Sequence, residues 1–352
     1  MSKYWNETVK KIEPYVPGEQ PKDRKYIKLN TNENPYPPSK NVIEAMKNVV
    51  GDDLKLYPDP NCDDLVGTIA DYYKLSHDQV FIGNGSDEIL AFSFMAFFSS
   101  DKKVLFPDIS YTFYKVYAEL FNLHYELVKL DDEFNIQLEK LKKPSASVIL
   151  PNPNAPTGKY IEVKELRKLV ESNSDNVVII DEAYIDFGGE SMVRYIDEYP
   201  NLLVVQTLSK SRALAGIRVG FALGHKDLIE GLNRIKNSIN SYTIDRVALA
   251  GGKAAIEDEK YFKEITRKII NTREYTIDNL KKLEFQVLDS KANFIFVRHK
   301  KMSGKYLYEI LKDNGILVRY FNKERIDNFL RITIGTDEEM KILIGKLTRI
   351  LN

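Results

Sequence analysis

The sequence predicts an α/β protein in which a large, mostly parallel sheet is followed by a smaller α+β unit. Up to about residue 240, short apolar runs alternate with helical patterns, whereas a long charged helix and a different succession of elements follow residue 255. The length of 352 residues is also too great for one small core and suits about two domains. We expect a large domain at 46–250 and a second unit formed by an N-terminal arm, 1–45, and residues 251–352.

The strands of the large domain are predicted from runs that are nearly all apolar. Such runs are expected where helices bury a strand on both faces. Each run ends abruptly in polar or turn residues, and ligands bind beyond the carboxyl ends of the strands in an open α/β sheet. The sequence therefore predicts a ligand site at that edge. The runs are QVFI (79–82), KVLF (103–106), SVIL (147–150), VVII (177–180) and LLVVQ (202–206).

Other signals predict the segments around this sheet. The first 45 or so residues contain many Pro, Asn and Lys residues, which indicates an extended arm and not a core element. A helix is expected at 40–50, and a long helix at about 245–282 is expected to bridge the two units. Beyond it, FQVL, NFIFVRH, ILVRYF and FLRITIG predict a smaller sheet, which we expect to be antiparallel.

Composition argues against several classes of function. Acidic and basic residues balance at 51 each, which gives no electrostatic footprint for nucleic acid or a membrane surface. One cysteine and four scattered histidines show no metal-ligand spacing. The N-terminus is charged throughout, and no apolar stretch approaches the length of a membrane span. We therefore expect a cytoplasmic protein without a metal, nucleic-acid or membrane partner.

Lys210 lies just beyond a predicted strand, in VVQTLSKSRALAGIRVGF. Most lysines are simply solvated, but this one has Thr207 and Ser209 in the same turn and Arg218 eight residues later. A lysine amine can form a Schiff base with a carbonyl cofactor. Two hydroxyls and an arginine supply the donors that a phosphate requires. The pattern therefore favours a carbonyl cofactor with a phosphate tail.

Asp181 directly follows the run VVII, and Tyr184 comes three residues later. A carboxylate at this place can pair with a pyridinium nitrogen and keep the ring an electron sink, with Tyr184 near the phenolic oxygen of the ring. The alternative is that Asp181 only caps a helix. The motif by itself leaves both interpretations open.

The turn GNGSDE brings Gly85, Ser86 and Asp87 to the start of a predicted helix. Glycine allows the chain to turn sharply after the strand, and the first N–H groups of a helix favour a phosphate. The turn is not a Walker motif, because no Gly-Lys followed by Ser or Thr is present.

Two further strand ends offer candidate cofactor contacts. Tyr111, in PDISYTFY, either stacks on a planar cofactor or packs in the core, and the sequence favours neither. Asn154, in PNPNAPTGKY, or a neighbouring backbone group offers a contact to a ring, although loops of this composition are usually simple turns.

The order of GNGSDE, SYTFY, NPNAPTG, DEAYIDF, TLSKSRALAGIRVGF and FLRITIG resembles that of the fold-type I pyridoxal 5′-phosphate (PLP) aminotransferases across nearly the whole chain. LNTNENPYPPS and KLYPDP make the chain similar to the histidinol-phosphate aminotransferase subfamily. The resemblance implies a mostly parallel seven-stranded sheet and PLP as the cofactor. It also implies transamination between histidinol phosphate and 2-oxoglutarate in histidine biosynthesis.

The resemblance assigns roles to individual residues. It implies that Lys210 carries the cofactor and moves a proton, that Asp181 pairs with the pyridine nitrogen, and that Tyr184 binds the ring oxygen while Tyr111 stacks on the ring. Arg331 is implied to hold the acidic group of the substrate. Tyr15, Asn32 and Asn34 are implied to belong to arm segments that close over substrate. Tyr57 is implied to reach the phosphate from the other subunit of a homodimer. The other implied phosphate-binding residues are Gly85, Ser86, Asp87, Thr207, Ser209 and Arg218.

One position departs from the family pattern, and other functions remain open. The family often has a second asparagine before Pro-Thr-Gly that touches the ring oxygen, whereas this chain has Ala155. Either Asn154 takes over that contact or Tyr184 serves alone. The alternative functions are a threonine-phosphate decarboxylase, an aromatic amino-acid aminotransferase and, more remotely, a non-catalytic binding protein on the same fold.

Overall fold

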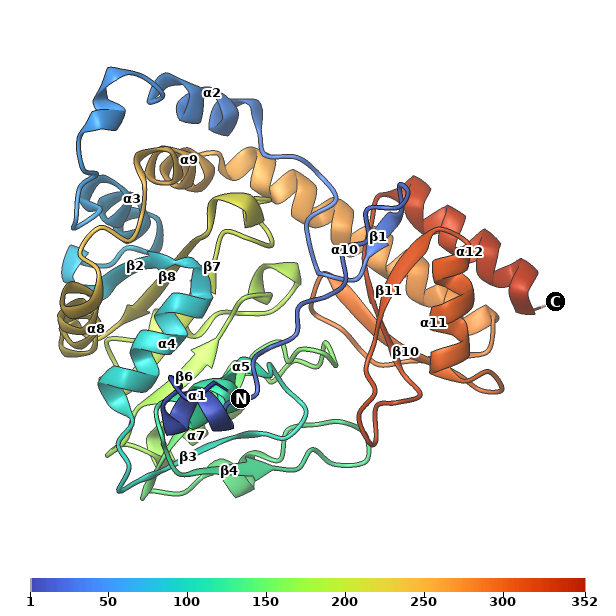
Figure 1. Cartoon of the computed structure of the whole chain (residues 1–352), viewed down its shortest axis with the longest axis horizontal. Coiled ribbons are helices and arrows are strands. Elements are labelled where there is room, and N and C mark those ends of the chain that lie inside the picture. Colours follow the sequence, from blue (N-terminus) through green and yellow to red (C-terminus); the bar gives the residue numbers. More distant parts are fainter. Residues whose placement is uncertain (1, 352) are drawn as a thin grey trace.

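Two sheets organise the chain, one of seven strands and one of five (Figure 1). The computed structural model describes residues 2–351. Helix α10 (Glu259–Lys282) runs from the larger sheet to the smaller one (Figure 1). This architecture confirms the predicted α/β fold with a mostly parallel seven-stranded sheet and a smaller unit. The domain limits at 46–250, 1–45 and 251–352 stay a prediction.

The large sheet has the strand order β2-β8-β7-β6-β5-β3-β4. Strand β8 is antiparallel to both of its neighbours, and the other pairs are parallel. The five predicted runs are all strands here. Two strands were not predicted: β4, a half-exposed edge strand, and β8, which contains two glycines and begins within the Lys210 motif. The strands are β2 (Val80–Asn84), β3 (Lys103–Pro107), β4 (Tyr125–Val128), β5 (Ala146–Pro151), β6 (Val178–Asp181), β7 (Leu202–Thr207) and β8 (Val219–Gly224).

Helices bury both faces of the large sheet, which explains why its central strands are apolar throughout. In β6, Val178 and Ile180 belong to one buried cluster, and Ile179 belongs to the cluster on the opposite face, because successive side chains of a strand alternate. The first face is covered by α2 (Lys40–Asn48), α3 (Asp63–Tyr73), α7 (Val163–Ser172) and α9 (Arg246–Glu257). The second is covered by α4 (Gly85–Phe97), α5 (Phe113–Leu120) and α8 (Lys226–Ile239).

The small sheet has the order β1-β11-β12-β10-β9. Its last four strands pair antiparallel, as expected, but β1 joins β11 in parallel. The arm is therefore not purely an extended segment outside the core, because it supplies this edge strand and buries Leu29. The elements are α1 (Glu7–Lys11), β1 (Ile27–Leu29), β9 (Phe285–Val287), β10 (Phe294–His299), α11 (Gly304–Asp313), β11 (Ile316–Tyr320), β12 (Leu330–Thr333) and α12 (Asp337–Leu351).

The bridging segment consists of two helices and not the single one expected at 245–282. Helix α9 ends at Glu257, and the Asp258 side chain then accepts the N–H of Tyr261 (3.3 Å) to cap α10. Short helical turns complete the chain at α6 (Leu138–Leu141), Asp52–Lys55, His77–Gln79, Ile185–Phe187, Met192–Tyr195 and Ala215–Ile217.

Residues 2–351 contain no helix with the length and apolar character needed to cross a membrane.

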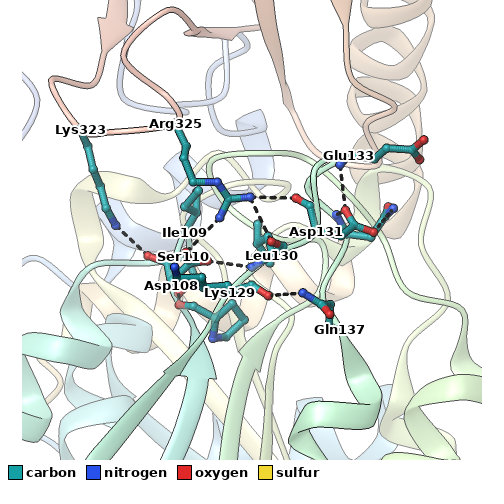
Figure 2. A network of polar contacts seen from close by, with 12 residues as sticks. Asp108, Ile109, Ser110, Lys129, Leu130, Asp131, Glu133, Gln137, Lys323 and Arg325 are labelled. Carbon is teal, nitrogen blue, oxygen red and sulfur yellow. Dashed lines mark hydrogen bonds and ion pairs between the residues drawn. The ribbon is translucent and has the colours of Figure 1, made fainter.

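A polar network around Asp108 and Arg325 joins the two units (Figure 2). Arg325 donates through Nη1 to Asp108 Oδ2 (3.1 Å) and through Nη2 to the carbonyls of Leu130 (3.0 Å) and Asp131 (2.9 Å). Lys323 Nζ donates to the carbonyl of Asp108 (2.7 Å). Because Asp108 directly follows β3, these bonds tie the loop that leads to Tyr111 to the second unit.

We expect Arg325→Ala to lower the free energy of unfolding by about 1–3 kcal/mol, because the Asp108 carboxylate and two carbonyls lose their donor. Denaturant unfolding measures the change. The matched control is Arg234→Ala, which removes an exposed ion pair with Glu230 on α8 and should cost less than about 0.5 kcal/mol. Equal losses in the two variants would contradict a special role for Arg325.

Candidate active site

A cavity of about 530 Å³ lies beyond the carboxyl ends of the central strands, between the large sheet, the arm and strands β11 and β12. The structure brings most of the predicted site residues into it, from segments far apart in the sequence. Those that line it are Tyr15, Asn32, Ser86, Asp87, Tyr111, Asp181, Tyr184, Thr207, Ser209, Lys210, Arg218 and Arg331.

Asp181 is the last residue of β6, and its carboxylate is buried at the cavity. Tyr114 Oη donates to Oδ2 (2.7 Å), and the N–H of Ala183 donates to Oδ1 (3.1 Å). Burial raises the pKa of Asp181 to about 6, against the opposing effect of the bond from Tyr114. Within residues 2–351 no cationic side chain makes an ion pair with this carboxylate, and a protonated pyridine nitrogen fits that place.

Lys210 enters the cavity from the turn after β7, near the face of Tyr184. Its Nζ lies 5.8 Å from the centroid of the Tyr184 ring. Asn34 Nδ2 donates to the carbonyls of Lys210 (2.8 Å) and Ser211 (3.3 Å), so the arm fixes the lysine backbone. Tyr184 is held in turn by Asn32, whose Nδ2 donates to its hydroxyl oxygen (3.0 Å), and by the edge-on ring of Phe294.

Arg218, two hydroxyls and the start of α4 form a cradle beside Lys210. Arg218 donates through Nη2 to Asp87 Oδ2 (3.0 Å) and through Nη1 to Ser209 Oγ (3.4 Å), and Thr207 Oγ1 donates to Ser209 Oγ (3.0 Å). Gly85 has a φ of 74°, and a Cβ there would lie 2.6 Å from Arg218 Nη2. Only glycine therefore allows the arginine to cross the N-terminus of this thirteen-residue helix. This donor set fits a phosphate.

Arg331 and Arg319 form the opposite wall, on the paired strands β12 and β11. Arg331 Nη2 donates to the carbonyl of Asn30 (2.8 Å), and its guanidinium lies over the rings of Phe294 and Phe321. Its buried Nε has no hydrogen-bond partner within residues 2–351. Two adjacent guanidinium groups with a free donor fit an acidic group of a substrate.

Four predicted residues do not line the cavity. Gly85 lies behind the cradle and Asn34 behind Lys210. Asn154 is buried with its Nδ2 bonded to the Ile109 carbonyl and to Thr157 Oγ1 (both 3.0 Å), whereas Ala155 faces the cavity. The amide nitrogen that was expected to replace the missing asparagine is thus engaged elsewhere. Tyr57 is 76% exposed and stacks on Tyr242, with ring centroids 4.6 Å apart.

Tyr114 and Arg319 are two residues of the site that the sequence did not indicate. Tyr114 lies in the first turn of α5, three residues after Tyr111, but a third aromatic in SYTFY gave no sign that it would bond Asp181. Arg319 lies in ILVRYF, a run that predicted a strand but gave no indication that its arginine belongs to the site. The available signal was its register opposite Arg331, and cross-strand pairing cannot be obtained from one sequence.

A lysine and a buried carboxylate thus meet at neighbouring strand ends of the large sheet, an arrangement that suits an enzyme working through a bound carbonyl cofactor. The family model for aminotransferase class I and II matches residues 24–347, and the chain belongs to that family.

Individual relatives agree with this placement. The chain is 74% identical over 352 residues to a histidinol-phosphate aminotransferase of Clostridium beijerinckii, with 100% of this chain and 98% of the relative covered. It is 61% identical to one of Clostridium acetobutylicum, with 99% of each covered. The structure of the Sinorhizobium meliloti histidinol-phosphate aminotransferase in complex with pyridoxal 5′-phosphate has a TM-score of 0.90 at 22% identity, covering 100% of this chain and 98% of that one, and shows the same fold.

We expect Asp181→Asn to stabilise the cofactor-free protein at pH 7. Since the pKa of Asp181 is raised from 3.8 to about 6, the folded state holds a proton that the unfolded state has already released, and wild-type stability falls as the pH rises between these values. Asp181→Asn has no carboxyl group to ionise at this position, so its stability does not fall in this way as the pH rises. Its advantage should therefore be small at pH 4 and reach about 3 kcal/mol above pH 6.

Denaturant unfolding of the two cofactor-free proteins between pH 4 and 8 measures this difference. A wild type that remains as stable as Asp181→Asn across the whole range would contradict the burial of an ionised carboxylate.

Proposed function

We propose that this chain is a PLP-dependent aminotransferase that transfers the amino group of histidinol phosphate to 2-oxoglutarate, giving imidazole acetol phosphate and glutamate, in histidine biosynthesis. The observation that carries the proposal is the cavity in which Lys210, Asp181 and the Arg218 cradle meet, in a chain 74% identical to a histidinol-phosphate aminotransferase over its full length. A cytoplasmic location stays a prediction.

Each residue around Lys210 has a separate task in this reaction. When bound, PLP supplies the electron sink that makes the carbon bearing the amino group acidic. Lys210 Nζ would hold the cofactor and would move a proton at that carbon, a general acid–base step that contributes about 10²–10⁴-fold. The Asp181 carboxylate would keep the pyridine nitrogen protonated, and the Tyr184 hydroxyl would donate to the ring oxygen.

The remaining residues bind and orient. Arg218, Ser209, Thr207 and the first N–H groups of α4 hold the cofactor phosphate. On the arm, Tyr15 stacks on Phe113, with ring centroids 4.5 Å apart, and approaches Tyr111. We propose that these rings cover the cavity and limit the access of water, which strengthens the electrostatic interactions within.

Arg331 and Arg319 hold the acidic end of either substrate. A planar guanidinium suits both phosphate and carboxylate, so Arg331 accepts histidinol phosphate in one half-reaction and glutamate in the other. It cannot select between them. Asn32 and Asn34 were expected to bind substrate, but their amide nitrogens contact Tyr184 and the Lys210 carbonyl. We propose that they position enzyme groups and that Tyr15 provides the neutral contact to substrate.

The test of substrate is a comparison of kcat/KM for histidinol phosphate, phenylalanine and threonine phosphate, with 2-oxoglutarate as acceptor. We expect histidinol phosphate to be used best, because a site that hydrogen-bonds a substrate group rejects analogues that lack it. Faster use of phenylalanine would make the enzyme an aromatic aminotransferase. Release of carbon dioxide from threonine phosphate would make it a decarboxylase, and the absence of any turnover would favour a binding protein.

We expect Arg331→Lys to lower kcat/KM in both half-reactions by about 10- to 100-fold, because the paired hydrogen bonds to an acidic group are lost. Stopped-flow measurement of each half-reaction separates the two. Arg298→Lys, an exposed change on β10, is the matched control and should leave both rates unchanged. A loss confined to one half-reaction would argue against a shared arginine.

We also propose that the enzyme is a homodimer whose subunits complete each other's sites. Tyr57 does not reach the cavity of its own chain, and it lies in an exposed apolar segment. Arg246 supports this segment by donating through Nη2 to the Tyr57 carbonyl (2.8 Å). Exposed apolar patches of this kind mark interaction sites. The large apolar residues exposed here are Val50, Leu54, Leu56 and Tyr57, with Tyr242 beside them.

Mixing impaired Tyr57→Phe and Lys210→Ala subunits should restore about a quarter of wild-type activity, since half of the dimers are hybrids with one intact site. Mixing Lys210→Ala with Asp181→Asn is the control and should restore nothing, because both residues belong to the same chain's cavity. Native mass spectrometry verifies that hybrids form. Their formation without recovered activity would rule out a shared site.

A further inference from the structure

Asn32 lies at the centre of hydrogen bonds that link the arm, the small sheet and Tyr184. It is 2% exposed, with a φ of 56°. Its Nδ2 donates to Tyr184 Oη (3.0 Å), and its backbone N–H donates to Thr333 Oγ1 (3.0 Å). Thr333 Oγ1 in turn donates to Asn32 Oδ1 (3.1 Å). One hydroxyl therefore holds both the backbone and the side chain of Asn32.

Asn293 holds the same residue from another side. Its Nδ2 donates to the Asn32 carbonyl (3.0 Å), and its own carbonyl accepts the N–H of Ile334 (2.9 Å). Asn293 and Thr333 are both buried, and neither lines the cavity. Their side chains are linked to Tyr184 through Asn32.

The single proton of the Thr333 hydroxyl decides how the Asn32 amide is oriented. Oγ1 already accepts the N–H of Asn32, so its proton goes to Oδ1 and Nδ2 is turned towards Tyr184. With the amide reversed, the Thr333 proton would lose this acceptor, and Thr333 Oγ1 makes no other hydrogen bond within the described chain. A buried donor without an acceptor is unfavourable. The orientation in which Asn32 donates to Tyr184 is therefore strongly preferred.

We propose that Thr333 and Asn293 are positioning residues that hold Asn32 as a fixed donor to Tyr184 and so leave the Tyr184 proton free for the ring oxygen of the cofactor. This inference rests on the proposed function, which supplies that oxygen. A hydroxyl that accepts one hydrogen bond becomes a stronger donor in the next. Ala155 brings no polar side-chain atom to the cavity and the Asn154 amide nitrogen is engaged, so Tyr184 carries this contact.

The contact has a spectroscopic consequence. A hydrogen bond from Tyr184 favours the form of the cofactor with negative charge on the ring oxygen, so weakening that bond raises the pH midpoint of the visible absorbance change of the holoenzyme. The charged groups that face Tyr184 are Lys210 and Arg331, and both remain in the variants below.

The test compares Thr333→Val with Thr333→Ser in the PLP-loaded enzyme. The valine variant keeps the shape and loses the hydroxyl, and its absorbance midpoint should rise by about one pH unit. The serine variant keeps the hydroxyl and should stay within a few tenths of the wild-type midpoint. Thr276→Val is the matched control, because its hydroxyl is equally buried but bonds the Thr272 carbonyl within α10. That control should not shift the midpoint.

A second comparison shows whether Thr333 acts through Tyr184. In a Tyr184→Phe background, Thr333→Val should cause no further shift, because the hydroxyl that Asn32 orients is gone. A shift that persists there, or equal shifts in the valine and serine variants, would overturn the inference. If the wild type shows the absorbance change and Thr333→Val has the same pH midpoint, the inference would also be overturned, but the proposed function would remain intact. A wild type that never acquires a visible PLP band would overturn both.

Discussion

The site depends on a carboxylate buried at the end of an apolar strand. Asp181 ends a run in which every residue is covered by helices, so its side chain leaves water when the sheet forms. The rise of its pKa from 3.8 to about 6 corresponds to about 3 kcal/mol of unfavourable free energy near neutral pH. Two hydrogen-bond donors reduce this cost, and a cationic ring nitrogen would remove it. The protein therefore folds around a place that favours a positively charged ligand group.

The neighbouring carboxyl group shows that burial alone does not make a site. Glu182 is also buried, and burial raises its pKa to about 7. It accepts hydrogen bonds from Ser191 Oγ (2.5 Å), the Met192 N–H (2.8 Å) and Gln206 Nε2 (2.9 Å). Successive side chains of an extended segment point to opposite sides, so Asp181 faces the cavity and Glu182 faces the protein. Glu182 thereby fixes the chain that follows Tyr184.

The small sheet takes part in both halves of the proposed chemistry. Strand β12 carries Arg331 and, two residues later on the same face, Thr333. The first faces the cavity, and the second orients Asn32 and through it Tyr184. A movement of this strand would displace together the arginine proposed to bind substrate and the proposed support of the cofactor ring. The bonds from Arg325 and Lys323, in the connection between β11 and β12, to Asp108 link this unit to the loop of Tyr111.

The sequence was sufficient to predict features that a local pattern of residues determines. It was insufficient for features that depend on the pairing of segments far apart in the chain. The sequence predicted strands β2, β3, β5, β6 and β7 and the cavity residues Lys210, Asp181 and Arg218, because strands buried on both faces are uniformly apolar and ligand groups follow their ends. It did not predict β8, which lies between β2 and β7. Strand β1 and the position of Arg319 were not predicted, since each depends on contacts between distant segments. The break at Asp258 was also missed, although the cap that Asp258 provides is a local signal. Dependence on distant contacts also explains why the role of Asn32 was not predicted. Its motif indicated the arm, but its role follows from Thr333, 301 residues later, and from Asn154 being held by Ile109 and Thr157. The network proposed to compensate for the asparagine missing at position 155 therefore exists only in the folded chain.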